Sequence, residues 1–441
     1  MYDIWLSLVL FITQSFLILT TKINSFPEIF FFPWLVSKGL IPYRDFFDHH
    51  GFLLYYILAP LTADKSMIGL RIFYFFIQTV NLFLVLKILK KITNKSGFFL
   101  GGLLFVFVNF FASGNTWWYE LAITTIYLII FLVWQKNIKR KYFIIGVLVA
   151  LASFIKPTAA IILIPICFIV WNIIPVFTFL FSWMIVLFLF FIKGGLIQLI
   201  NNLFLFNFYL SQHYYDPYFS DERFVYISAL IVILAIGINL ISRKLKKAIP
   251  LVFFTLFSII FFFRAYNRPH LVPVATFGSL LVAQTISSVK RWRKTLLIGA
   301  LLIYLLIIVR KIYIERISLD LYRSKNNNKK YNQLMKKEKV YVLGNQPQFY
   351  YFSNQLPSTH YPLLFPLVDK YVPGFETQLI NELGRNNVRT IIIPLPVEEQ
   401  FSQLSVVKNY IYQKYTLLER TKDFEIYIRK KLYTADLDRI L

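Results

Sequence analysis

The chain has 441 residues, of which 57% are hydrophobic, and a mean hydropathy of +0.60. Soluble domains are about 45–50% apolar, so this composition excludes a soluble globular protein and predicts a polytopic membrane protein. The net charge of +25 does not indicate nucleic-acid binding, because the basic residues cluster in short loops between apolar runs, as the positive-inside rule predicts. The single cysteine, Cys167, excludes an intramolecular disulfide framework and a cysteine-based zinc site.

About eleven apolar segments are predicted to span the membrane, since a bilayer crossing takes about 20 residues in a helix. The first is interpreted as a retained helix, because it lacks the basic start and the cleavage site of a signal peptide. In chain order the segments are Ile4–Thr20, Met67–Leu89, Gly97–Phe111, Tyr119–Trp134, Tyr142–Phe154, Thr158–Trp171, Pro175–Phe191, Val225–Ile241, Ile249–Phe263, Leu271–Ser288 and Thr295–Val309.

The charges of the connecting loops predict the orientation. With eleven spans, four strongly basic loops fall on one side, which should be cytoplasmic; they are Lys87–Lys95, Lys136–Lys141, Arg243–Lys247 and Lys290–Lys294. Arg310 and Lys311 fall on the opposite side, against this rule. That outer side receives the segments Glu28–Tyr56, Ser113–Trp118, Lys193–Phe224 and Arg264–His270, and the C-terminal tail.

The chain changes character after the last predicted span. Strand-like and helix-like stretches alternate there, which is typical of a small α/β domain. The strands are expected at Lys339–Gly344, Val388–Pro394 and Phe424–Arg429, and the helices at Pro347–Ser353 and Thr377–Gly384. We therefore predict a transmembrane domain over residues 1–311, with a first outer loop at 21–66, and an extracytoplasmic α/β domain over 312–441.

The first outer loop concentrates ionisable residues in a chain that is only 16% charged. Such groups are costly beside a membrane unless they are paired or functional. Residues Glu28–Lys38 are predicted to lie as an interfacial helix that Gly39 and Pro42 end. The loop carries Glu28, Arg44, Asp45, Asp48, His49 and His50.

The pattern of this loop resembles the GT-C glycosyltransferases, and in particular the protein O-mannosyltransferase and aminoarabinose transferase group. Glu28 stands where the family has an acidic pair, Gly39-Leu-Ile-Pro-Tyr-Arg-Asp45 matches a turn of the family, and His50-Gly-Phe-Leu-Leu-Tyr-Tyr56 stands where a Lys-Pro-Pro-Leu-x-Tyr-Trp-like segment leads to the second helix. The resemblance implies a GT-C-like α-helical polytopic fold. It also implies transfer of a sugar from a polyprenyl-phosphate-linked donor to an extracytoplasmic acceptor.

Glycosyl transfer from a lipid phosphate needs a general base for the acceptor and cationic donors for the leaving phosphate. The candidate bases are Asp45, Glu28 and Asp48, in that order. Arg44 is expected to hold Asp45 ionised, or only to pin the loop, and Asp48 is alternatively a helix cap. The candidate substrate contacts are Arg44, His49, His50, Lys156, Arg264, Arg268 and His270.

No cofactor is predicted, and a metal-independent inverting transfer is favoured. Adjacent histidines also indicate metal binding, but Asp45 or Asp48 would have to join His49 and His50. The predicted partners are the lipid-linked donor, the acceptor (a lipid, glycan or protein) and the bilayer, in a bacterial inner membrane. The alternatives are a polymerase or ligase of lipid-linked glycans, a transporter or flippase, and a non-catalytic scaffold.

Overall fold

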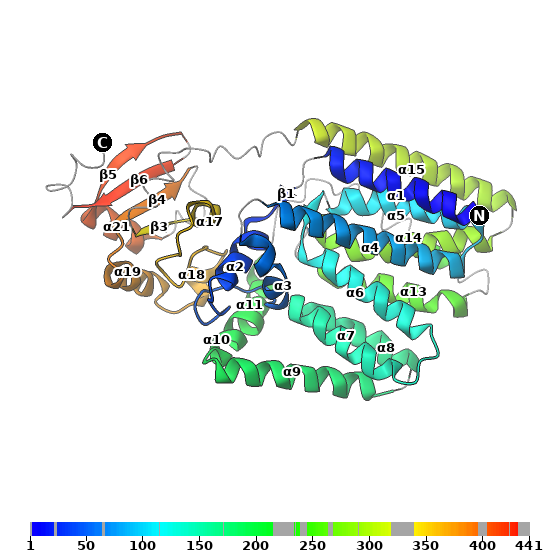
Figure 1. Ribbon diagram of the computed structural model, residues 1–441, viewed down its shortest axis with the longest axis horizontal. Helices are drawn as coiled ribbons and strands as arrows, with labels where there is room; N and C mark the ends of the chain where they lie inside the picture. Colours follow the sequence, from blue (N-terminus) through cyan, green and yellow to red (C-terminus); the bar gives the residue numbers. More distant parts are fainter. Residues whose placement is uncertain are drawn as a thin grey trace. The chain divides into compact units, whose positions relative to one another are not determined.

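The computed structural model divides into two compact units, each described by itself below (Figure 1). The helical unit comprises Met1–Phe26, Ile68–Leu187 and Tyr215–Arg323, and the mixed unit comprises Pro27–Met67, Phe188–Tyr214 and Ser324–Leu441. The predicted boundary at residue 311 stays a prediction. The structure describes residues 2–21, 24–63, 67–113, 115–170, 172–214, 233, 235–238, 245–262, 268–289, 291–318, 339–395, 404–422 and 424–430.

Apolar helices dominate the helical unit, whose inner helices are α5 and α14. Helix α5 packs against α1, α4, α14 and α15, while α6 packs against α4 and α7. Two short strands, β1 (Asn24–Ser25) and β2 (Thr116–Trp117), pair in parallel. The helices are α1 (Tyr2–Thr20), α4 (Ile68–Ile92), α5 (Lys95–Ser113), α6 (Tyr119–Trp134), α7 (Lys141–Ile155), the 3₁₀ helix η1 (Pro157–Ile162), α8 (Leu163–Val170), α9 (Ile174–Ile192), α13 (Leu245–Ser258), the 3₁₀ helices η3 (Ile259–Phe262) and η4 (Arg268–Leu271), α14 (Val272–Ser288) and α15 (Arg291–Ser318).

Small residues on α5 explain why its neighbours come so close. A Cβ atom added at Gly101 would lie 2.5 Å from the Ala283 side chain of α14, and one added at Gly102 would lie 2.4 Å from Leu10 of α1. Gly97 and Gly101 form a Gly-x-x-x-Gly pair, the pattern that lets membrane helices pack backbone to backbone. The sequence of α5 thus fixes the tight centre of this unit.

Within the described residues, five helices are long and apolar enough to cross a membrane, and several shorter apolar helices accompany them. The long ones are Ile68–Ile92, Lys95–Ser113, Ile174–Ile192, Arg268–Ser288 and Lys294–Ile314. Each predicted span except Val225–Ile241, most of which lies outside the described residues, coincides with one of these helices or with a shorter one. The total of about eleven stays a prediction.

The mixed unit contains a four-stranded sheet of order β3-β4-β6-β5, in which β3 and β4 are parallel and the other pairs are antiparallel. Strands β3 (Val340–Val342), β4 (Thr390–Pro394) and β6 (Phe424–Arg429) and helices α17 (Gln348–Ser353) and α19 (Phe375–Arg385) lie where the sequence predicts them. The other elements are α2 (Pro27–Ser37), α3 (Leu53–Thr62), α10 (Leu196–Leu199), the π-helix η2 (Ile200–Phe206), α11 (Asn207–His213), α18 (Val368–Tyr371), α21 (Ser405–Lys414) and β5 (Tyr415–Arg420).

In the mixed unit the first loop packs directly against the C-terminal segment. Phe31 of α2 stacks on Tyr350 of α17 with ring centroids 5.9 Å apart. The backbone N–H of Phe47 donates to the His360 carbonyl at 2.7 Å, and the Tyr351 hydroxyl donates to the Thr62 carbonyl at 3.1 Å. The C-terminal segment therefore helps to hold the loop that carries most of the predicted site residues.

Candidate functional site

The turn after α2 is held in an unusual backbone conformation. Gly39 has φ +87°, which suits glycine, but the buried Tyr43 also has a positive φ of +68°. A bulky residue rarely adopts this left-handed region, and such strain persists only where the surroundings impose it. The Tyr43 hydroxyl donates to the His50 carbonyl at 2.6 Å. The strained turn is thus tied to the histidine pair.

Arg44 and Asp45 form the ion pair that the sequence predicts. Arg44 Nε and Nη2 donate to the two Asp45 carboxylate oxygens, each at 2.8 Å, and the Ile41 N–H donates to Asp45 Oδ2 at 2.7 Å. Partial burial acts to raise the pKa of Asp45, but the hydrogen bonds from Arg44 and Ile41 outweigh it and lower the pKa. Arg44 Nη1 also donates to the Lys193 carbonyl at 3.0 Å. With both oxygens engaged, this pair fits a role in fixing the loop.

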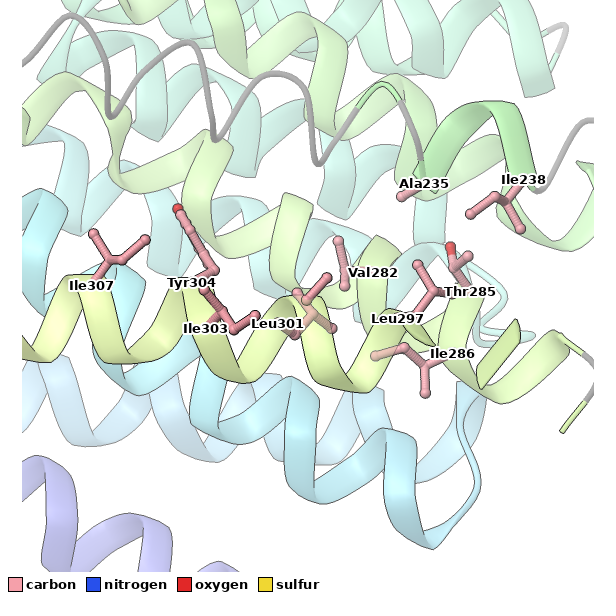
Figure 2. Close-up of a pocket in the computed structure, with 11 residues that line it drawn as sticks. Ala235, Ile238, Val282, Thr285, Ile286, Leu297, Leu301, Ile303, Tyr304 and Ile307 are labelled. Atoms are coloured by element: carbon pink, nitrogen blue, oxygen red, sulfur yellow. The ribbon is translucent and has the colours of Figure 1, made fainter. Parts of the chain in front are cut away.

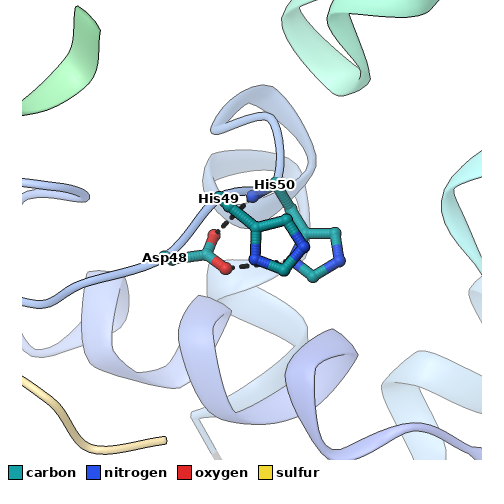
Figure 3. Close-up of side chains that lie close together, drawn as sticks. All are labelled: Asp48, His49 and His50. Carbon is teal, nitrogen blue, oxygen red and sulfur yellow. Dashed lines mark hydrogen bonds and ion pairs between the residues drawn. The ribbon is translucent and has the colours of Figure 1, made fainter. Parts of the chain in front are cut away.

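Asp48 and His50 form a second pair, and this one is buried (Figure 3). His50 Nδ1 lies 2.9 Å from Asp48 Oδ1, the His50 backbone N–H donates to Oδ2 at 3.2 Å, and the Tyr55 hydroxyl also donates to Oδ2. The Asp48 side chain is fully buried and that of His50 is 17% exposed. Where Asp48 Oδ1 accepts this hydrogen bond, Nδ1 is the donor, and Nε2 is the ring nitrogen that Asp48 does not contact.

His49 lies beside this pair but in an aromatic setting. Its ring centroid is 4.1 Å from that of His50 and 4.4 Å from that of Phe365 in the C-terminal segment. Asn207 of α11 donates to the His49 carbonyl at 2.6 Å. Three chain segments distant in sequence therefore meet at the histidine pair.

Glu28 is buried near the same residues. Burial raises the pKa of its carboxyl, and both Asp48 and His50 lie close enough to affect that pKa. Its Oε2 atom has no hydrogen-bond partner within the described part of the chain. A backbone hydrogen bond to the carboxyl of Glu28 acts to lower the same pKa, but burial outweighs it, and leaving the buried Oε2 atom unpartnered is costly.

One atom each of Asp48, His49 and His50 lies within 4.8 Å of the other two, so these residues are a possible metal-binding group. Both oxygens of Asp48 already accept hydrogen bonds from His50 and Tyr55. A cation ligated by Asp48 would compete with these donors. The arrangement is that of a carboxylate that orients a histidine, and imidazole nitrogen is a ligand that transition metals prefer.

A second ionisable cluster lies in the helical unit, where sequence reasoning found two of its three members. Glu120, at the start of α6, is fully buried, and its Oε1 atom lies 2.5 Å from Lys156 Nζ and 2.5 Å from His270 Nδ1. The sequence predicts Lys156 and His270 as separate contacts and does not single out Glu120. The sequence does carry one indication of its role: Glu120 is a single acidic residue at the start of an apolar span, and cations lie at the ends of other spans.

The Arg268 guanidinium lies over the ring of Phe111, 4.6 Å from the ring centroid. Lys311 of α15 contacts the same ring at 5.8 Å. This cation–π contact gives Lys311 a partner; the side of the membrane on which it lies stays a prediction. Arg264 lies outside the described residues.

An apolar cavity of about 250 Å³ lies in the helical unit between α14, α15 and residues 235–238 (Figure 2). Its lining has no acidic or basic side chain, and apart from the hydroxyls of Thr285 and Tyr304 it offers hydrocarbon contacts. The lining residues are Ala235, Ile238, Val282, Thr285, Ile286, Leu297, Ala300, Leu301, Ile303, Tyr304 and Ile307.

Two solved structures share this architecture. The crystal structure of the Archaeoglobus fulgidus oligosaccharyltransferase, tethered with an acceptor peptide containing the NVT sequon via a disulfide bond, matches with a TM-score of 0.57 and 10% identity over 97% of this chain and 74% of that one. The cryo-EM structure of arabinofuranosyltransferase AftD from mycobacteria matches with a TM-score of 0.53 and 13% identity over 96% of this chain and 40% of that one. No family model and no curated protein matches the sequence.

Both neighbours are membrane glycosyltransferases of the GT-C type. The predicted GT-C-like fold of an integral membrane protein is therefore confirmed. The chain spans less than half of the mycobacterial enzyme, and at 10% and 13% identity the likeness shows the fold alone.

Proposed function

We propose that the protein is a glycosyltransferase that moves one sugar from a polyprenyl-phosphate-linked donor to an acceptor on the extracytoplasmic side of a bacterial inner membrane. The shared fold supports glycosyl transfer in general. The membrane setting favours a lipid-linked donor, and the basic loops favour this orientation of the outer loop. The observation that carries the proposal is the buried Asp48–His50 pair on that loop.

The pair has the geometry of an oriented general base. In the proposed reaction His50 Nε2 takes the proton of an acceptor hydroxyl while Asp48 holds the ring through Nδ1 and stabilises the imidazolium that forms. The acceptor oxygen forms its bond to the anomeric carbon as the bond from that carbon to the phosphate oxygen breaks. The phosphate leaves with the electron pair, the anomeric configuration inverts, and neither a metal nor a covalent intermediate is required.

Among the three carboxylates predicted as bases, we favour Asp48, acting through His50. Asp45 is the weaker choice because Arg44 occupies both its oxygens and its pKa is lowered. Glu28, with its raised pKa, is the reserve candidate, since a less acidic carboxyl is the stronger base.

The cations of the helical unit are proposed to recognise the donor phosphate. Lys156 and His270 share one oxygen of Glu120, so the carboxylate holds two nitrogen donors close together. A phosphate that meets such donors gains charge-assisted hydrogen bonds. Arg268 and Arg264 are further candidates for the same contact.

The test is turnover of radiolabelled polyprenyl-phosphate sugars in membranes that contain the wild type, His50→Gln or Asp45→Asn at matched expression. We expect the His50 variant to lose about 10²–10⁴-fold in rate, the usual contribution of a general base. The Asp45 variant, matched in location, should lose far less. Equal losses in both variants would remove the assignment, and a wild type that turns over no donor would count against the transferase.

A further inference from the structure

A row of aromatic rings begins at the histidine pair and runs through the mixed unit. The ring of His49 contacts Phe206 with centroids 5.6 Å apart, and Phe206 contacts Tyr371 of α18 at 4.9 Å. Tyr371 contacts Tyr209 of α11 at 5.3 Å, and Tyr209 stacks on His213 at 4.2 Å with an interplanar angle of 24°. We call Phe206, Tyr371, Tyr209 and His213 the aromatic row.

Exposure increases along the aromatic row away from His49. Phe206 is fully buried, Tyr371 and Tyr209 are half-buried, and His213 is exposed. Rings that served only to fill a core would be covered throughout. Here the rings of Tyr371, Tyr209 and His213 remain partly accessible, while contacts with neighbouring rings hold them in place.

The backbone beneath the row is also unusual. Residues Ile200–Phe206 form the π-helix η2, which continues into α11. π-Helical turns are rare and are frequent at functional sites. The extra residue per turn changes the direction of the side chains that follow, and Asn207 reaches the His49 carbonyl at 2.6 Å.

Polar groups accompany the exposed rings. The Tyr371 hydroxyl donates to the Asn201 carbonyl at 3.3 Å and keeps acceptor lone pairs. Bonding between His213 Nδ1 and the Tyr209 carbonyl, 3.0 Å apart, leaves Nε2 as an acceptor. Aromatic faces with a few positioned polar groups are what an orienting ligand site offers.

We propose that the aromatic row binds the sugar rings of a glycan acceptor, so that the substrate class of the transferase is a carbohydrate chain. Sugar rings present apolar C–H faces to Tyr371, Tyr209 and His213 while their hydroxyls meet the polar groups. The chain end then lies toward His49 and its neighbour His50. The inference rests on the proposed function, because it identifies the acceptor of that reaction.

A lipid surface is the competing occupant, since tyrosine is also common at membrane interfaces. Helix α11 offers an internal control in Phe208, which is 64% exposed. Because Phe208 and Tyr209 are adjacent in the helix, their side chains leave it in different directions. A surface that only contacts lipid would depend on Phe208 at least as much as on the row. A glycan site depends on the row alone.

The test measures binding of short mannan, arabinan and galactan oligosaccharides to the purified full-length protein by saturation-transfer NMR. Wild type is compared with Tyr209→Ala, Tyr371→Ala and Phe208→Ala. Loss of one stacking contact should weaken binding about 3- to 10-fold in each tyrosine variant. Phe208→Ala should bind as wild type does.

Binding to none of the three glycans would overturn the proposal, as would an equal loss in Phe208→Ala. In turnover assays the tyrosine variants should raise the KM for the acceptor and leave kcat unchanged. A wild type that transfers sugar to a peptide or lipid, with the tyrosine variants unaffected, would refute the glycan site while the transferase stands. Row-dependent glycan binding without transfer would support the glycan site and refute the transferase.

Discussion

The substitution Asp48→Asn isolates the proposed base from the packing around it. Oδ2 accepts from the Tyr55 hydroxyl and from the His50 backbone N–H, while Oδ1 alone faces His50 Nδ1. An asparagine can keep its oxygen at the Oδ2 position, where it accepts from Tyr55 and from the His50 backbone N–H. Its amide nitrogen must then face His50 Nδ1. Two donors cannot face one another, so the imidazole is expected to move its proton to Nε2 and lose its role as a base.

The expected effects on stability and activity therefore differ in size. One hydrogen bond is exchanged, which changes the free energy of unfolding by about 0.5–1.5 kcal/mol. Loss of the correctly oriented base lowers kcat/KM by about 10²–10⁴-fold, which is about 3–5 kcal/mol at 1.36 kcal/mol per tenfold change in rate.

The assay is the rate of donor turnover by purified Asp48→Asn, together with its thermal unfolding midpoint. The double variant with His50→Gln should be no slower than His50→Gln alone, because residues that act as a unit are not additive. An Asp48 variant with activity within about threefold of wild type would refute the reasoning. So would a loss in rate that only follows the amount of folded protein.

Three further predictions concern the same loop. Tyr43→Phe removes the hydrogen bond to the His50 carbonyl, so kcat should fall about 3- to 10-fold while the KM for the donor stays unchanged. A change in KM alone would count against a role of Tyr43 in positioning His50. Burial raises the pKa of Glu28, so its carboxyl destabilises the folded protein increasingly as the pH rises from the unfolded-state pKa through the folded-state pKa. Glu28→Gln should therefore raise the Tm at neutral pH by about 2–4 °C and make the Tm less dependent on pH. A pH profile of Tm equal to that of the wild type would contradict this prediction. Treatment with EDTA should leave the turnover rate within about twofold of the untreated enzyme, because the proposed base is an imidazole. Added Zn²⁺ should inhibit turnover by binding His49 and His50. Inactivation by EDTA that Mg²⁺ or Mn²⁺ reverses would refute the metal-free mechanism.

The elements that are predictable from sequence are those with a local cause. Apolar runs give the membrane helices, and β-branched stretches give β4 and β6. The sequence does not predict strand β5 (Tyr415–Arg420), whose pairing with β6 is irregular between Leu417 and Glu419; such an irregularity breaks the alternation that marks a strand. The Arg44–Asp45 pair was predictable because its partners are adjacent.

Contacts between distant residues were not predictable from local pattern. Glu120 meets His270 across 150 positions in the chain, and no local signal states which cation an acid will find. Asp48 is predicted from sequence as a candidate base or a helix cap, but its contacts with Tyr55 and His50 are visible only in the folded chain. The aromatic row likewise joins α11 to α18 through ring contacts that only the folded chain brings together.

The central claim is that the protein cleaves a polyprenyl-phosphate sugar by transferring the sugar. The most direct measurement is the release of free polyprenyl phosphate from a donor labelled in its sugar, with purified protein in liposomes and an oligosaccharide acceptor. The account predicts that polyprenyl phosphate appears in step with labelled oligosaccharide for wild type, and that both signals fall together in His50→Gln. An intact donor with wild type, or equal release by His50→Gln, would contradict it.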